Sequence, residues 1–143
     1  MKFSVKTRYA VRILFELSAA DAPLSIYHLS DRTGLSPRVA EDICTQLRYE
    51  GISTGIVGPG GGIRLEVPLG EISLGRLVKL FEGGVAFAVC CGDKANDCPN
   101  QHVCENRAVW RKLSAKIQEE LDAIPLDSLL LRQGTCVAGL SLK

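Results

Sequence analysis

Four of the six cysteines and one of the two histidines of this 143-residue chain lie in one short segment, from Cys90 to Cys104. Glycine, proline, asparagine and aspartate fill the gaps, so this segment is expected to be turn-like. Soft thiolates on such a loop suit an iron–sulfur cluster or zinc. The spacing Cys91-x6-Cys98-x5-Cys104 is wider than the C-x2-C pairs of structural zinc sites, which favours a cluster. Buried free or oxidised cysteines are the alternative that the spacing leaves open.

The remaining composition is that of an ordinary globular protein. Hydrophobic residues make up 46% of the chain and charged residues 23%, and the net charge of +1 neither favours nor excludes nucleic acid. Any basic face must therefore be local. No signal peptide and no run of about 20 apolar residues is visible, so we expect a cytoplasmic protein without a membrane partner. In a reducing cytoplasm the cysteines are more readily metal ligands or redox sensors than structural disulfides.

The N-terminal half has the pattern of a helix-turn-helix followed by a hairpin. The spacing of apolar residues predicts three helices, over 7–20, 26–33 and 37–50. Gly34 separates the second from the third, which Ser36 caps and Pro37 begins. Two strands, 52–57 and 63–67, flank the glycine-rich run 58–62. A helix-turn-helix directly followed by a hairpin predicts a winged helix. The glycine run is not expected to cradle phosphate, because no helix begins after it.

Two further helices are expected, one after Ser73 and a longer one after Cys104 that ends at Pro125. The long helix carries an apolar stripe at steps of three or four residues, which includes Trp110, Leu113, Ile117 and Leu121. A lone amphipathic helix must bury its stripe, and a second copy of the chain is an economical partner. We therefore predict a homodimer with these four residues in its interface. Packing against its own N-terminal domain remains the alternative.

The predicted architecture is mainly α-helical, a winged helix-turn-helix domain followed by a long C-terminal dimerisation helix. Its predicted parts are a DNA-binding domain over 1–82, a cysteine-rich loop over 83–104, the dimerisation helix with a short terminal helix over 105–132, and a tail over 133–143.

Taken in order, these pieces resemble the iron–sulfur cluster regulator family of bacteria, the winged-helix repressors of the IscR/NsrR type. The resemblance extends over about residues 1–132. It rests on the opening Met-Lys-Phe-Ser-Val-Lys-Thr-Arg-Tyr-Ala-Val-Arg, the Leu47-Arg and Gly51-Ile pairs, the wing run 58–62, and the three spaced cysteines with Trp110 six residues after the third. It implies a homodimeric repressor whose affinity for a double-stranded DNA operator is set by a 2Fe–2S or 4Fe–4S cluster. Cys91, Cys98 and Cys104 correspond to the three cysteine ligands.

Departures from the family leave part of the ligand set open. The family usually has five residues in each gap, whereas here the first gap is six from Cys91 or seven from Cys90. We prefer Cys91, since adjacent side chains of an extended chain point to opposite sides and both cysteines are not expected to bind. Arginines, Arg8 and Arg107, occupy the two places from which family members supply a fourth ligand. His102, Cys90 or a residue elsewhere remains possible.

The polar side of the 37–50 helix is the expected DNA-reading face. Glu41 falls where family members place a glutamate that reads cytosine, and a carboxylate can accept from the cytosine amino group in the major groove. A solvated helix charge is the alternative for Glu41. The remaining predicted DNA contacts are phosphate-binding Lys6, Arg8, Arg38 and Arg48, together with Ser36 and the wing residues Gly60 and Gly61. Val57 replaces the arginine common before the wing glycines, so base preference is expected to differ.

No catalytic constellation is visible, so no enzyme is expected. His28 and His102 are far apart in sequence, and no Ser/His/Asp or paired-carboxylate arrangement can be argued. One alternative keeps the DNA binding and replaces the cluster with zinc or a thiol–disulfide switch. Another is a small electron-transfer or cluster-carrier protein, which would have no use for a recognition helix.

Overall fold

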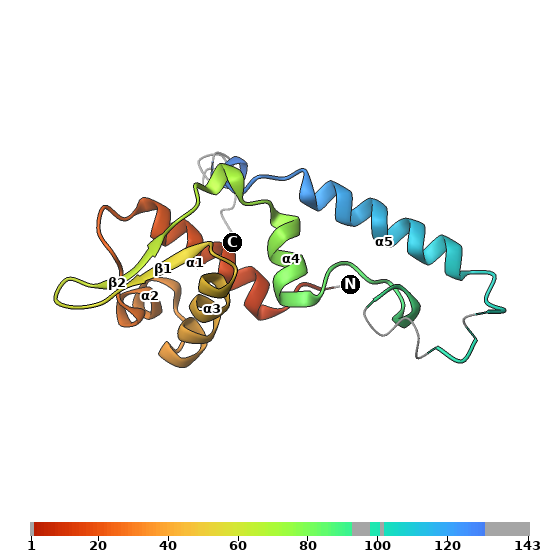
Figure 1. The fold of residues 1–143 in the computed structure, drawn as a ribbon, viewed down its shortest axis with the longest axis horizontal. Helices are drawn as coiled ribbons and strands as arrows, with labels where there is room; N and C mark the ends of the chain where they lie inside the picture. Colours follow the sequence, from red (N-terminus) through yellow and green to blue (C-terminus); the bar gives the residue numbers. More distant parts are fainter. Residues whose placement is uncertain (1, 93–97, 101, 131–143) are drawn as a thin grey trace, which may run out of the picture.

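The computed structural model describes residues 2–92, 98–100 and 102–130. Along the chain the elements are α1 (Val5–Ala19), α2 (Ile26–Thr33), α3 (Pro37–Tyr49), β1 (Ser53–Ile56), β2 (Gly62–Leu65), the 3-10 turn η1 (Leu69–Glu71), α4 (Leu74–Glu82), the 3-10 turn η2 (Val89–Cys91) and α5 (Arg107–Asp122). Figure 1 shows an elongated molecule, with α1 to β2 gathered at one end, α5 extending away from them, and α4 between. The predicted winged helix is confirmed, with element ends shifted by one or two residues.

The helix-turn-helix is built by local capping. The Ser25 hydroxyl accepts from the backbone N–H of His28 at the start of α2, and that of Ser36 accepts from Val39 at the start of α3. Gly34 ends α2 in the left-handed conformation at φ 74°, which a glycine adopts without strain. These short-range contacts set the turn between the two helices, as the sequence predicts.

The wing is an antiparallel pair of β1 and β2, with Ser53 opposite Leu65 and Ile56 opposite Gly62. Leu24 joins it, since its N–H donates to the Ile63 carbonyl at 2.9 Å and its own carbonyl accepts from Ile63 at 2.7 Å. A Cβ on Gly62 would lie 2.6 Å from the Leu24 carbonyl carbon, so only glycine permits this approach. The base of the wing is therefore attached to the segment that precedes α2.

One core holds the winged-helix domain together, and the chain after α5 returns to this core. Its fully buried side chains come from every helix of the domain and include Ile13, Leu14, Leu29, Ile43, Leu47, Ile52, Ile72, Leu77 and Leu126. The backbone of Leu126 is held beside this core, since its N–H donates to the Ile72 carbonyl at 2.9 Å. The neighbouring residues Ser73 and Pro125 form an antiparallel β-bridge. The end of α5 is thus attached to the start of α4. Within the residues that the structure describes, no helix combines the length and apolar character needed to cross a bilayer.

Candidate DNA-binding surface and cysteine segment

The α3 helix buries one face and leaves its polar face exposed. Ala40, Ile43 and Leu47 lie in the core, and Cys44 joins them at 1% exposure. Burial raises the pKa of the Cys44 thiol to about 12. Arg38 and Glu41 are exposed on the opposite side. The side chains predicted to read or bind DNA are therefore available to a ligand.

The structure brings Glu41 and Arg48 together with the wing. Both side chains line a hollow of about 410 Å³ between α3 and β1–β2, which Ile56 and Val57 close from the other side. Val57 is fully exposed. The two parts of the predicted DNA surface, helix and wing, thus face the same space.

The wing glycines have a structural explanation. Gly60 has φ 74°, and the N–H of Gly61 donates to the Gly58 carbonyl at 2.9 Å to close the turn. A Cβ on Gly61 would lie 2.2 Å from the carbonyl oxygen of Ile56. The turn itself therefore requires glycine here, and a DNA contact from Gly60 or Gly61 stays a prediction.

Lys6 has a partner that the sequence pattern does not reveal. Its ammonium pairs with the Asp42 carboxylate of α3 at 2.6 Å, and both side chains are about half exposed. This hydrogen bond holds the pKa of Asp42 below its usual range. The ion pair joins α1 to α3, which is the predicted DNA-reading helix and is called the recognition helix below. A phosphate bound by Lys6 would compete with Asp42. Arg8 is exposed, and its DNA contact stays a prediction.

The described parts of the cysteine segment, 90–92, 98–100 and 102–104, lie toward the end of α5 that is away from the wing (Figure 1). Its described cysteines are free thiols: Cys90 is buried, Cys91 and Cys98 are half-buried, and Cys104 is exposed. Among the described residues, no three side chains of the His, Cys, Asp and Glu types come together as a metal site. Residues 93–97 and 101 lie outside the described part. The three-thiol donor set fits an iron–sulfur cluster in kind, and the ligand assignment stays a prediction.

The expectation that Cys90 and Cys91 lie in extended chain, with their side chains on opposite sides, is wrong. The two residues lie in η2, a 3-10 turn, and not in extended chain, and their sulfurs are 3.9 Å apart. Exposure distinguishes them instead. Burial raises the pKa of the Cys90 thiol, whereas Cys91 lines a hollow of about 350 Å³ between the 83–92 segment and α5. Cys91 is therefore the more accessible of the two thiols.

The predicted dimer face of α5 is exposed in the single chain. Trp110, Leu113 and Ile117 are 40%, 43% and 39% exposed, and Leu121 is half-buried. The helix contacts the rest of its own chain through another face, on which Ser114, Gln118 and Asp122 lie one turn apart. Trp110, Leu113 and Ile117 are thus not fully buried within the single chain, and their place in a dimer interface stays a prediction.

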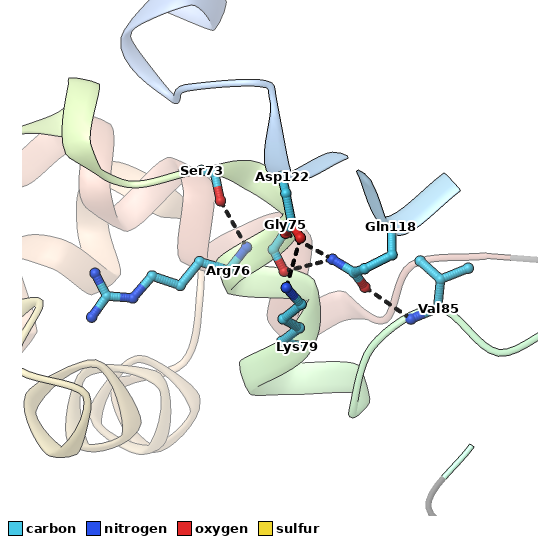
Figure 2. A network of polar contacts seen from close by, with 7 residues as sticks. All are labelled: Ser73, Gly75, Arg76, Lys79, Val85, Gln118 and Asp122. Atoms are coloured by element: carbon cyan, nitrogen blue, oxygen red, sulfur yellow. Dashed lines mark hydrogen bonds and ion pairs between the residues drawn. The ribbon is translucent and has the colours of Figure 1, made fainter. Parts of the chain in front are cut away.

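A polar network, which we call the Gln118 network, joins α5 to α4 and to the chain before the cysteines (Figure 2). It consists of Gly75 and Lys79 of α4, Val85, and Gln118 and Asp122 of α5. The hydrogen bond from Lys79 holds the pKa of Asp122 below its usual range. Sequence reasoning missed this network, because Lys79, Gln118 and Asp122 each look like solvated polar positions, and Gly75 and Val85 take part only through their backbones.

Comparison with known proteins points to one family. Residues 3–132 match the model of the Rrf2 family, described as an iron-dependent transcriptional regulator. The chain is 32% identical over 133 residues to the HTH-type transcriptional regulator IscR of Aliivibrio salmonicida, covering 92% of this chain and 78% of that one. The matched proteins are regulators and not enzymes, in agreement with the expectation from the sequence.

Solved structures give the same result. IscR of T. potens superimposes with a TM-score of 0.71 at 26% identity, covering 100% of this chain and 94% of that one. CymR, the global cysteine regulator of B. subtilis, superimposes with a TM-score of 0.69 at 25% identity, covering 90% of this chain and 95% of that one.

Proposed function

Because this chain belongs to the Rrf2 family of transcriptional regulators, we propose that it is a homodimeric repressor. Its affinity for a double-stranded DNA operator is set by an iron–sulfur cluster on the 91–104 segment, and it acts in the cytoplasm. The observation that carries the DNA-binding part is the exposed polar face of α3 opposite the wing, with Glu41 and Arg48 in one hollow. A recognition helix and a wing that face the same space suit a major groove and its neighbouring backbone.

The exposed stripe of α5 supports the homodimer. Three large apolar side chains near 40% exposure lie on one face, and their own chain covers a different face of the helix. A second α5 offers the same stripe, so a two-fold axis can bury both together. Two recognition helices on a two-fold axis would bind half-sites about 34 Å apart.

The cysteines support an iron–sulfur cofactor by their chemistry and position. Cys91, Cys98 and Cys104 would hold the cluster as thiolates, and the fourth ligand is left open. When bound, the cluster supplies a group whose loss or oxidation changes the charge and ligation of this segment. The chain's own part is to keep Cys91 and Cys98 partly exposed and Cys104 exposed, next to the start of α5.

One alternative keeps the DNA-binding fold and replaces the cluster with zinc or a thiol–disulfide switch. The close approach of the Cys90 and Cys91 sulfurs, 3.9 Å apart, suits two thiolates on one zinc ion better than a disulfide, because the Cα atoms of adjacent residues lie closer than a disulfide usually allows. Membership in a family of regulators leaves the electron-carrier alternative without support.

The test is a DNA-binding titration with cluster-loaded and cluster-free protein at one salt concentration, on the promoter of the protein's own operon. We expect affinities that differ by about 5–150-fold, the usual range of allosteric coupling. Iron and the visible absorption of anaerobically purified protein should be lost in Cys98→Ala and retained in Cys44→Ala. Equimolar zinc without iron would favour the alternative, and equal affinities would show that the cluster is not the switch.

A further inference from the structure

The α4 helix contacts the recognition helix directly. The guanidinium of Arg76 donates to the carbonyl of Glu50 at 3.0 Å, and Glu50 is the residue that caps the C-terminus of α3. The last carbonyls of a helix have no partner inside it, and a cation there also interacts favourably with the helix dipole. Ser73 caps the first turn of α4 by accepting from the Arg76 N–H at 3.1 Å (Figure 2). A movement of α4 therefore acts on the end of α3.

The other end of α4 is attached to the N-terminus of α1. Glu82 accepts from the Ser4 N–H at 2.8 Å and from the Thr7 hydroxyl. Burial raises the pKa of Glu82, but these hydrogen bonds outweigh that effect and lower it. Lys6 lies in the same first turn of α1 and pairs with Asp42 of α3. The α4 helix thus reaches the recognition helix at its C-terminus directly and at its middle through α1.

Gln118 joins α4 to the chain that leads into the cysteine segment. Its Oε1 accepts from the Val85 N–H at 3.1 Å, and its Nε2 donates to the Gly75 carbonyl at 3.3 Å and to the Asp122 Oδ1 at 2.9 Å. This orientation of the amide satisfies two acceptors and one donor together, whereas the reverse orientation would satisfy none of them. Val85 is 7% exposed, so its N–H depends on Gln118.

The contact between α5 and α4 is close enough to transmit a displacement. A Cβ on Gly75 would lie 2.6 Å from the backbone nitrogen of Asp122, so the two helix backbones touch at this point. Lys79 holds the Asp122 carboxylate at 2.6 Å beside it. Because the two backbones touch at this point, a displacement of one helix at the contact displaces the other.

We infer that Gln118 is a positioning residue that couples the cysteine segment to the recognition helix, through Gly75 of α4 and from there through Arg76 to Glu50. The inference rests on the proposed function, since it describes how a change in the cysteine segment alters operator affinity. When a change in the cysteine segment displaces Val85, Gln118 either follows Val85 and moves away from α4, or loses its hydrogen bond to the Val85 N–H. Either result changes the support that α4 gives to the end of α3.

Two substitutions at Gln118 break the network in different ways. Gln118→Glu keeps an acceptor for Val85 but places a carboxylate against the Gly75 carbonyl and Asp122. Gln118→Met keeps the size and removes every hydrogen bond. In both variants we expect cluster-loaded and cluster-free protein to bind the operator with affinities that differ by no more than about threefold. The iron content should be unchanged.

Arg76→Met breaks the same connection at its other end and should have the same effect on the ratio. Glu119→Gln is the matched control, because Glu119 is the exposed neighbour of Gln118 and its side chain takes no part in the network. An unchanged ratio in Gln118→Met, with wild-type iron content, would overturn the inference.

A second measurement tests the connection without the cluster. Coupling is reciprocal, so operator DNA bound to cluster-free protein should slow amide hydrogen exchange in residues 85–92. We expect this slowing in the wild type and in Glu119→Gln, and its loss in Gln118→Met. The inference fails if DNA slows exchange equally in wild type and Gln118→Met, or slows it in neither. If cluster-loaded and cluster-free wild type bind the operator equally well but DNA still slows exchange in residues 85–92, the proposed function fails. The connection through Gln118 would then stand.

Discussion

Replacing Gly75 by alanine should push α5 away from α4. The new Cβ would lie 2.0 Å from the Oδ1 of Asp122, 2.6 Å from its backbone nitrogen and 2.8 Å from its Cα, where ordinary contact begins near 3.4 Å. The two backbones must therefore separate by roughly 0.6–0.8 Å, which is the gap that ordinary van der Waals contact requires. The 3.3 Å bond from Gln118 to the Gly75 carbonyl would be stretched or lost.

The free energy of unfolding receives two opposing contributions. Overpacking against a backbone costs about 1–3 kcal/mol, while alanine inside a helix stabilises by about 1 kcal/mol relative to glycine. We therefore expect a net destabilisation of about 1 kcal/mol, equivalent to a Tm lower by about 2–4 °C for a chain of this size. Urea unfolding followed by circular dichroism measures it, at one fixed protein concentration because a dimer is proposed.

Two control variants show whether the backbone is the obstacle. A Cβ on Gly70 would meet only the carboxylate of Asp127, at 2.9 Å, and that flexible side chain can turn away, so Gly70→Ala should cost less than about 0.5 kcal/mol. Removing the Asp122 side chain relieves the contact with Oδ1 but leaves the backbone in place, so Asp122→Ala should rescue Gly75→Ala only in part. Wild-type stability of Gly75→Ala, or full rescue by Asp122→Ala, would refute the argument that the backbones touch.

The remaining predictions concern three other regions. Since burial raises the pKa of Cys44 from 9.0 to about 12, this thiol should resist iodoacetamide at pH 8 while the exposed Cys104 of cluster-free protein reacts, as mass spectrometry would show. The neutral thiol is favoured in the folded chain, so the stability contributed by Cys44 should be present below pH 9 and fall as the pH rises from 9 toward 12, and Cys44→Ala should remove this loss. Ile117→Asp would place a charge in the proposed dimer interface and should weaken the dimer. A dimer mass equal to that of the wild type in light scattering would contradict this interface. Glu41→Ala should relax base preference at one position per half-site. Arg38→Ala should instead weaken the affinity for all DNA sequences about equally and reduce the slope of log affinity against log salt concentration by about one. Identical effects of the two variants on base preference would contradict these roles.

The sequence alone was sufficient for the winged helix, because its signals are local. Ser36 caps α3 through a residue three positions away, and Gly34 ends α2 within its own turn. The apolar periodicity that places Ile43 and Leu47 in the core needs no knowledge of what covers them. The antiparallel hairpin is equally local, since its turn lies between the two strands that it joins.

The contacts of α5 could not be predicted in this way. Apolar periodicity assigns the buried face of a helix to its apolar stripe, yet α5 meets α4 through Gln118 and Asp122, and meets the segment after α4 through Ser114. This is possible because backbone N–H and C=O groups and Lys79 supply partners for those polar side chains. Periodicity carries no information about partners from another element.

The ion pair of Lys6 and the position of Cys90 illustrate the same limit. From composition, Lys6 is a free cation suited to phosphate, and only the packing of α1 on α3 places Asp42 within 2.6 Å of it. The 3-10 turn of η2 brings the sulfurs of Cys90 and Cys91 to 3.9 Å, where an extended chain would separate them. The sequence by itself determined the elements, their caps and the apolar core, because those depend on neighbours within a few residues. Only the tertiary structure decided which polar groups meet, because a hydrogen bond between distant segments depends on distances that the order of residues does not contain.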